Sequence, residues 1–198
     1  AGTPVAGVLN YLRISLMDHD LASQAAGPLA WGDDYLAGGP DDDMIWAQLG
    51  DDVVQGDGDV DFRVNGAKVG AWRDASGYLH VLPSYEAPTD GDDYIEGGGG
   101  HDVVFGGLGA DDIIGGSSSM FSLTTMARRP DAGDLLFGGA GTDVARNDDT
   151  RGHLADSDVI VGDNGNILRV VVADSTVLTR APWDQRSQRQ ALDLGLLL

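Results

Sequence analysis

Short apolar segments recur along this chain at an interval of nine residues, and each follows an aspartate and a glycine-rich stretch. Asp93, Asp102 and Asp111 follow this interval without a gap. Nine residues accommodate a tight turn and a very short strand whose middle side chain points inward. A short fixed period with glycine-rich turns is typical of repeat folds, in which a single unit cannot bury a core by itself.

The same spacing occurs earlier in the chain, at Asp34, Asp43 and Asp52, and later, at Asp134 and Asp143. The side chain two residues after each aspartate is apolar, and we predict that these side chains form the core. They are Leu36, Ile45, Val54, Ile95, Val104, Ile113, Leu136 and Ala145.

The residue types in each turn favour calcium. Calcium binds about six to eight oxygen ligands from carboxylates, backbone carbonyls and water. Glycines adopt backbone conformations that let several carbonyls point at one position. The acidic side chains are almost all aspartates, with Glu86 and Glu96 as the two glutamates. The short aspartate side chain suits an ion held against its own turn.

Stacked turns would bring neighbouring carboxylates to roughly 5 Å, the spacing of adjacent strands. Each such pair costs on the order of 1 kcal/mol even in water, and more when it is partly buried. These costs accumulate along a stack. We therefore expect the turns to stay open until a divalent cation binds, so that binding and folding are one event.

The segments GGGGHDVVF (97–105) and GGLGADDII (106–114) resemble the RTX, or haemolysin-type, calcium-binding nonapeptide repeat. GGAGTDVAR (138–146), GGPDDDMIW (38–46) and AQLGDDVVQ (47–55) are partial copies. The resemblance implies an all-β fold, a parallel β-roll or β-solenoid, with several Ca²⁺ ions between its turns. It also implies that aspartate side chains and glycine-turn carbonyls bind these ions. The implied metal ligands are Asp34, Asp43, Asp52, Asp93, Asp102, Asp111, Asp134, Asp143, Gly97, Gly98, Gly100, Gly106, Gly107, Gly109, Gly138, Gly139 and Gly141.

Two aspartates depart from the repeat pattern. Asp61 keeps the spacing, but Arg63 stands where its core residue belongs. Asp158 precedes Ile160 as expected, yet Asp156 replaces a glycine. We expect Asp61 and Asp158 to be weak ligands at most.

The chain divides into a cap segment (1–28), an interrupted β-roll (29–166) and a terminal strand or tail segment (167–198). The roll is interrupted at about 62–89 and 117–131, and these insertions either loop out of one continuous roll or separate two short ones. We favour one roll, because solenoid repeats need neighbours. Apolar residues near the start of the chain recur at the spacing of a helix. They predict a capping helix, with a strand as the alternative. Asn65-Gly66 predicts a hairpin within 62–72, and 77–88 predicts another strand near Pro83.

Composition agrees with a calcium-dependent extracellular protein. The formal net charge is −20, which argues against partners such as nucleic acid and anionic membranes. No cysteine is present, so disulfides do not staple the fold. No apolar run reaches the ~18 residues of a membrane span. We expect a secreted or cell-surface location, and a chain that is a processed product or a segment of a larger protein.

Residues beside the predicted core positions should face outward, yet many of them are apolar. One interpretation is that the insertions cover them; the other is that they pack against a second subunit or domain. These residues are Tyr35, Met44, Trp46, Val53, Tyr94, Val103, Phe105, Ile114, Leu135 and Phe137.

Catalytic motifs are not found: the sequence has neither HExxH nor GxSxG. His101 occupies a variable position of a repeat, and we expect it to be a solvated turn residue. We therefore predict no enzyme, and a calcium-binding structural repeat module that Ca²⁺ folds and stabilises. The alternatives are a calcium-dependent self-assembling subunit (filament, surface layer or adhesin segment) and an accessory domain of a secreted hydrolase.

Overall fold

The computed structural model describes residue 19 and residues 32–142 and 156–168. The predicted cap segment (1–28), apart from His19, and nearly all of the terminal segment (167–198) lie outside the described residues. Asp143 and Ala145 also lie outside them. None of the helices among the described residues has the length and apolar character needed to cross a bilayer.

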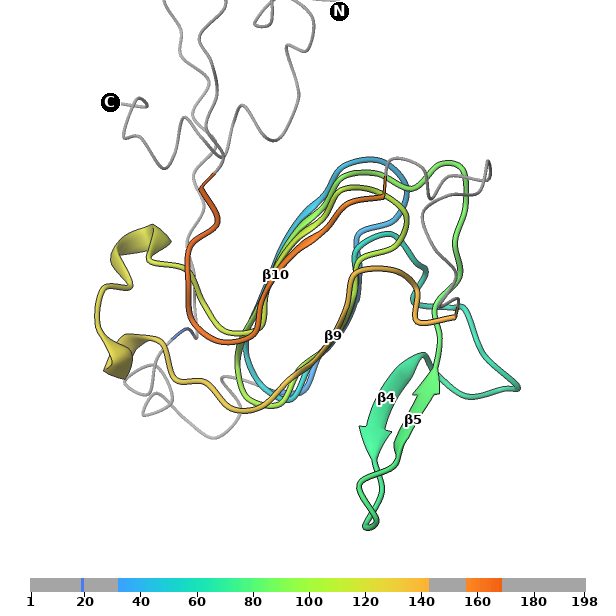
Figure 1. Ribbon diagram of the computed structural model, residues 1–198, viewed down its shortest axis with the longest axis horizontal. Helices are drawn as coiled ribbons and strands as arrows, with labels where there is room; N and C mark the ends of the chain where they lie inside the picture. The colour runs from blue at the N-terminus through green and yellow to red at the C-terminus, as the bar shows by residue number, and fades with distance from the viewer. Residues whose placement is uncertain (1–18, 20–31, 143–155, 169–198) are drawn as a thin grey trace, which may run out of the picture.

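Two four-stranded parallel sheets form the body of the protein, and successive strands of the repeats alternate between them (Figure 1). The expectation of an all-β chain is confirmed. The first sheet has the order β1 (Tyr35–Ala37), β3 (Val53–Gln55), β7 (Val103–Phe105) and β9 (Leu135–Phe137). The second sheet has the order β2 (Met44–Leu49), β6 (Tyr94–Gly99), β8 (Asp112–Ile114) and β10 (Val159–Val161).

The core lies between the two sheets. In the first sheet Val54 pairs with Val104, and in the second Ile95 pairs with Ile113. These four side chains are fully buried in one cluster, against which Leu36, Ile45 and Leu136 pack. The predicted core is therefore confirmed for every member that lies within the described residues. Pairing in exact register places each core residue directly above the next, as a nine-residue period requires.

The insertions leave both sheets intact. β3 pairs with β7, although residues 56–102 separate them in sequence, and β2 pairs with β6 in the same way. Within the first insertion, β4 (Gly70–Arg73) and β5 (Leu79–Leu82) form an antiparallel pair that projects from the sheets (Figure 1). The predicted turn at Asn65-Gly66 is confirmed, because Val64 and Ala67 bridge across it and both turn residues have positive φ.

The insertions also cover much of the outward-facing apolar surface, as the first interpretation predicts. Phe105 and Val103 are buried beside Val69 and Val81 of the first insertion. On the second sheet, Trp46 packs edge-on against Phe121 of the second insertion. That insertion contains two short 3₁₀ helices, η1 (Met120–Ser122) and η2 (Met126–Arg128).

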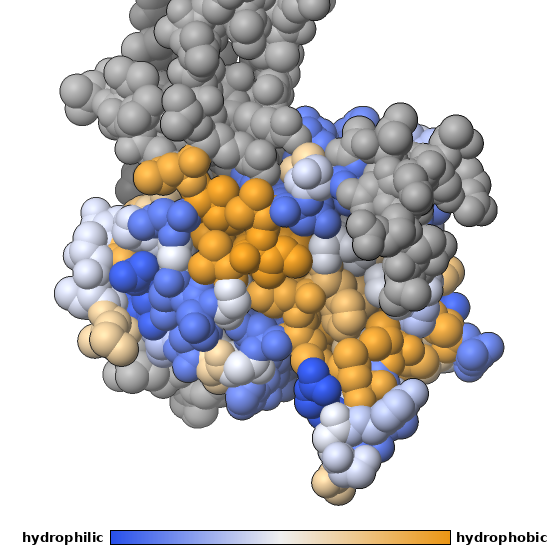
Figure 2. All heavy atoms as spheres, in the orientation of Figure 1, coloured by the Kyte–Doolittle hydropathy of each residue, from blue (hydrophilic) through white to orange (hydrophobic). Residues whose placement is uncertain are grey.

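Apolar residues still gather on the face of the molecule that Figure 2 shows. Val159 and Ile160 of β10, the last strand of the second sheet, are 38% and 44% exposed. The end of this sheet is therefore only partly covered by the described residues.

Truncation of the core should be far more costly than truncation at the exposed end of the same sheet. Ile113→Ala removes a fully buried side chain and should lower the free energy of unfolding by about 2–5 kcal/mol. Ile160→Ala, its matched control on β10, should lower it by under about 1 kcal/mol. Urea unfolding in one calcium-containing buffer measures both values. Equal losses would contradict the assignment of the core.

Candidate metal centre

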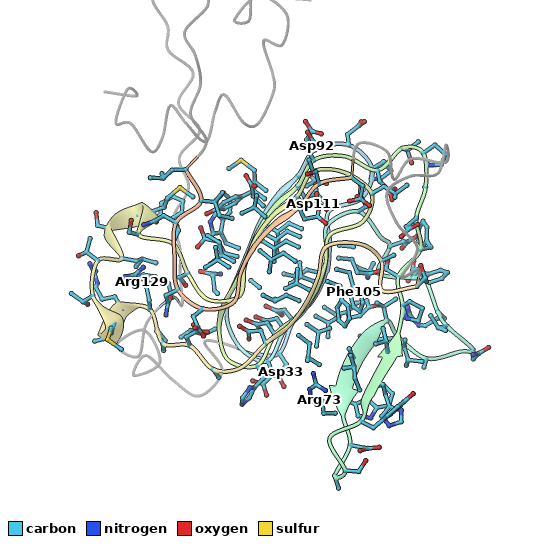
Figure 3. All side chains as sticks on the ribbon, viewed as in Figure 1. Asp33, Arg73, Asp92, Phe105, Asp111 and Arg129 are labelled. Atoms are coloured by element: carbon cyan, nitrogen blue, oxygen red, sulfur yellow. The ribbon has the colours of Figure 1, made fainter. Side chains whose placement is uncertain are left out.

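Eight aspartates form two ladders, one at each edge where the chain enters a sheet. Each of these aspartates stands directly before a strand of its sheet. The first ladder leads into the first sheet and contains Asp34, Asp52, Asp102 and Asp134. The second ladder leads into the second sheet and contains Asp43, Asp93, Asp111 and Asp158. Figure 3 shows Asp33, beside the first ladder, and Asp111, of the second, at opposite ends of the stacked turns.

Hydrogen bonds of one kind connect each ladder. The backbone N–H of one aspartate donates to the Oδ1 of the aspartate in the next turn. The N···O distances run from 2.6 Å between Asp34 and Asp52 to 3.1 Å between Asp111 and Asp158. One oxygen of each accepting carboxylate is thus satisfied by the backbone of its neighbour.

A second row of aspartates, one residue earlier, bonds in the opposite direction along the stack. Asp33 Oδ1 accepts the N–H of Asp51, and Asp51 Oδ1 accepts that of His101. At the other edge, Asp42 Oδ1 accepts the N–H of Asp92. Adjacent turns are therefore tied from both sides, and the second-row carboxylates remain largely exposed.

The other oxygen of four ladder carboxylates has no comparable partner among the described residues. Asp93, Asp102 and Asp111 are at most 1% exposed, and the Oδ2 of each has no hydrogen-bond partner among the described residues. The same holds for Asp134 Oδ2. Between described residues, the one ion pair joins His80 and Asp74 on the hairpin, away from the ladders. Burying an uncompensated carboxylate is costly, so these oxygens require a cation or a proton.

A glycine opens the space around each of these oxygens. A Cβ on Gly97 would stand 2.5 Å from Asp102 Oδ2 and would also overlap the Gly115 carbonyl oxygen of the following turn. Each such glycine therefore marks a place where a carboxylate oxygen and a carbonyl oxygen of adjacent turns converge. The same arrangement recurs at Gly38, Gly56, Gly106 and Gly115.

Burial and mutual repulsion hold protons on these carboxylates. Burial, followed by the charges of neighbouring aspartates, raises the pKa of Asp93, Asp102 and Asp111 from 3.8 to about 8. The same causes raise the pKa of Asp134 and Asp158 to about 6. Backbone N–H donors oppose these shifts without cancelling them.

The structure brings together every predicted aspartate that it describes. Gly97, Gly106 and Gly138 lie against a ladder carboxylate, whereas Gly98, Gly100, Gly107, Gly109 and Gly141 have positive φ in the turns. Gly139 has no such close contact and an ordinary φ.

Of the two aspartates that the sequence marks as weak ligands at most, Asp158 departs from this interpretation and Asp61 agrees with it. Asp158 belongs to the second ladder although its turn lacks the repeat's glycine, and its Oδ2 lies against Gly138. Asp61, by contrast, is an exposed turn residue whose N–H bonds to Asp59. His101 is exposed, as expected, with its Nδ1 2.9 Å from the Gly133 carbonyl oxygen.

The donor set fits calcium. Within the part of the chain that the structure describes, no three acidic or histidine side chains converge as a metal cluster. An ion bound here would therefore take many of its ligands from backbone carbonyls. Carboxylate and carbonyl oxygens, with no nitrogen or sulfur ligand, are the set that Ca²⁺ prefers.

The comparisons with known proteins agree with this chemistry. The family model of the RTX calcium-binding nonapeptide repeat (4 copies) matches residues 30–62 and 89–119. The resemblance seen in the sequence is thereby confirmed for these two segments. No curated protein and no solved structure matches the chain.

Without calcium, the fold should lose stability as pH rises. The pKa values of five ladder carboxylates lie above 3.8, so the folded chain holds protons that the unfolded chain releases; the five are Asp93, Asp102, Asp111, Asp134 and Asp158. The stabilising contribution is complete below about pH 4 and disappears as pH rises through about 6 and then 8. Circular dichroism in chelator should therefore show more β structure at pH 5 than at pH 8.

Asp111→Asn should flatten this pH dependence, because it removes one of the shifted groups. Asp59→Asn, at an exposed position, should leave it nearly unchanged. A β signal in chelator that grows from pH 5 to pH 8 would contradict the assignment.

Proposed function

We propose that this chain is a calcium-binding structural repeat module whose two sheets form one continuous parallel β-roll, folded and stabilised by Ca²⁺. The observation that carries the proposal is the unsatisfied second oxygen of the buried Asp93, Asp102 and Asp111 carboxylates. Each of these oxygens lies where a glycine carbonyl of the next turn also converges. The RTX repeats in residues 30–62 and 89–119 support calcium as the ion.

Strand pairing supports a single roll. Strands from before and after the 62–89 insertion pair within the same two sheets, in a register that keeps the ladders continuous. The core positions from both sides of the insertion also form one cluster. A roll in two separate halves would leave three short turns to build each core, which is too little for a repeat fold.

Calcium would act by replacing the protons on the ladders. When bound between turns, Ca²⁺ supplies positive charge against the free Oδ2 atoms and removes the repulsion between them. Asp93, Asp102 and Asp111 would each hold an ion through this atom, while their Oδ1 atoms keep the turns stacked. Because the unfolded chain has no such arrangement, binding free energy becomes folding free energy.

A secreted or cell-surface setting suits this chemistry. Calcium sites of extracellular modules have dissociation constants of roughly 10⁻⁴–10⁻³ M, matched to the calcium concentration outside cells. The repeats themselves are a further, weaker support for secretion. We assign the chain no catalytic step.

Calcium-dependent self-assembly is the second candidate. The observation that favours it is the partly exposed apolar end of the second sheet at Val159 and Ile160. The first candidate is preferred because the insertions already cover Phe105, Val103 and Trp46, which would otherwise form the assembling ribbon.

Removal of ladder carboxylates should remove bound calcium. Asp102→Asn and Asp111→Asn, one in each ladder, keep an oxygen to accept the N–H of Asp52 or Asp93 but lose the charge. Each should lower the number of bound ions measured by isothermal titration calorimetry and raise the calcium concentration needed for folding about tenfold.

Asp61→Asn is the matched control, since Asp61 keeps the repeat spacing but lies outside both ladders. It should bind as many ions as the unaltered chain. If Asp102→Asn and Asp111→Asn leave stoichiometry and calcium-induced β structure unchanged, the ladders are not the metal site.

A further inference from the structure

One buried carboxylate belongs to neither ladder. Asp57 follows Gly56 at the end of β3 and is 2% exposed. It occupies the place that a glycine, Gly107, holds in the neighbouring turn, because Gln55 pairs with Phe105 and the registers continue from there. The Asp57 N–H donates to the Gly106 carbonyl just as the Gly107 N–H donates to the Gly138 carbonyl. A charged side chain thus replaces a repeat glycine inside the turn.

Asp57 holds together the two ends of the first insertion. Its Oδ1 accepts the N–H of Gly91 at 2.9 Å, which joins residues 34 positions apart. The turn that begins with Gly56 and Asp57 is therefore completed by residues 90–93, with the whole insertion looped out between them. One oxygen is sufficient for this structural role.

The other oxygen of Asp57 is not explained by that role. Asp57 Oδ2 is buried and has no hydrogen-bond partner among the described residues. It lies against Gly107, whose φ of +125° and missing Cβ leave room for it. Burial and the charges of Asp90, Asp111 and Asp43 raise the pKa of Asp57 to about 8, against the opposing effect of the Gly91 N–H.

Asp93, the ladder member on the far side of the insertion, points its own free Oδ2 into the same pair of turns. That oxygen lies against Gly56, whose Cβ would also stand 2.5 Å from the Gly106 carbonyl oxygen. After burial, and against the backbone N–H of Asp43, the charge of Asp57 is the largest neighbouring charge that raises the pKa of Asp93. Two buried, unsatisfied carboxylate oxygens therefore lie in the turns at the Gly56–Gly106 step, one against Gly56 and the other against Gly107.

We infer that Asp57 is a second carboxylate ligand at this step, and that Asp57 and Asp93 together form the tightest cation site of the chain. The inference rests on the proposed function and extends it to a residue outside the repeat pattern. Calcium affinity increases with the number of charged ligands, and this step offers two where a regular turn offers one ladder carboxylate. A cation here also fixes the base of the first insertion, because its two ligands come from either side of that insertion.

The test compares two substitutions of Asp57 in the full chain, with calcium as the titrant and a competing chelator as the indicator. Asp57→Asn retains an oxygen for the Gly91 N–H but loses the charge, whereas Asp57→Ala loses both. A ligand role predicts that both variants weaken the tightest class of sites by about tenfold or more. Asp59→Asn, an exposed neighbour, should stay within about twofold of the unaltered chain.

The inference is overturned if Asp57→Asn binds calcium as tightly as the unaltered chain and only Asp57→Ala binds it more weakly. Asp57 is then a hydrogen-bond acceptor only. That result would leave the proposed function standing, because Asp102→Asn reports on it separately. An unaltered chain that binds no calcium would overturn both. Far-ultraviolet circular dichroism at saturating calcium verifies that each variant has folded before its affinity is compared.

Discussion

The fold depends on how its buried carboxylates are neutralised. Asp93, Asp102, Asp111 and Asp134 each use one oxygen to accept a backbone N–H of the neighbouring turn and keep the other in a buried position. The first bond stacks the turns, and the second oxygen makes that stack unfavourable unless a proton or a cation accompanies it. Stacking and repulsion therefore arise from the same side chain. Because of this coupling, the stability of the fold depends on the concentration of the cation.

The rest of the architecture follows from this arrangement. The ladder residue stands at the start of each short strand, so the residue two positions later lies in the middle of that strand and points into the core. The glycine that opens the next turn makes space for the free oxygen. Turn, carboxylate and core residue thus fill one nine-residue unit, and the core stays narrow, with Ala47 of β2 added to the repeated positions. Such a narrow core offers limited apolar burial, which makes the contribution of the cation more important.

Much of this was predictable because the information is local. The spacing of Asp93, Asp102 and Asp111 is enough to predict the turns, the inward side chains and the chemistry of the ion. Asp61 and Asp158 show where local information is insufficient. Asp61 keeps the spacing along the chain but lies in the insertion, whereas Asp158 loses the glycine pattern yet completes a ladder. Whether an aspartate belongs to a ladder depends on its position in space. A long insertion breaks the relation between the interval along the sequence and the position in the stack of turns.

Asp57 was missed for the same reason, because its turn is completed by residues that follow the first insertion. Cover of Phe105 by an insertion was one of two interpretations of the sequence, but the sequence did not identify Val69 and Val81 as the residues that supply it. An insertion that covers the outer face of a sheet leaves no periodic signal in the sequence. The turn at Asn65-Gly66 was visible in the sequence, but the pairing of β4 with β5 and the surface on which they pack were not.

The central claim is that a divalent cation of calcium's size turns repulsive ladders into a folded stack. The most direct test is a calcium titration of chelator-stripped protein at pH 8, followed by far-ultraviolet circular dichroism, with a parallel magnesium titration. The account predicts a cooperative gain of β signal with calcium that magnesium does not reproduce, because magnesium demands a stricter octahedral geometry and gives up its waters reluctantly. A chain that is already fully β-structured in chelator, and indifferent to calcium, would contradict it.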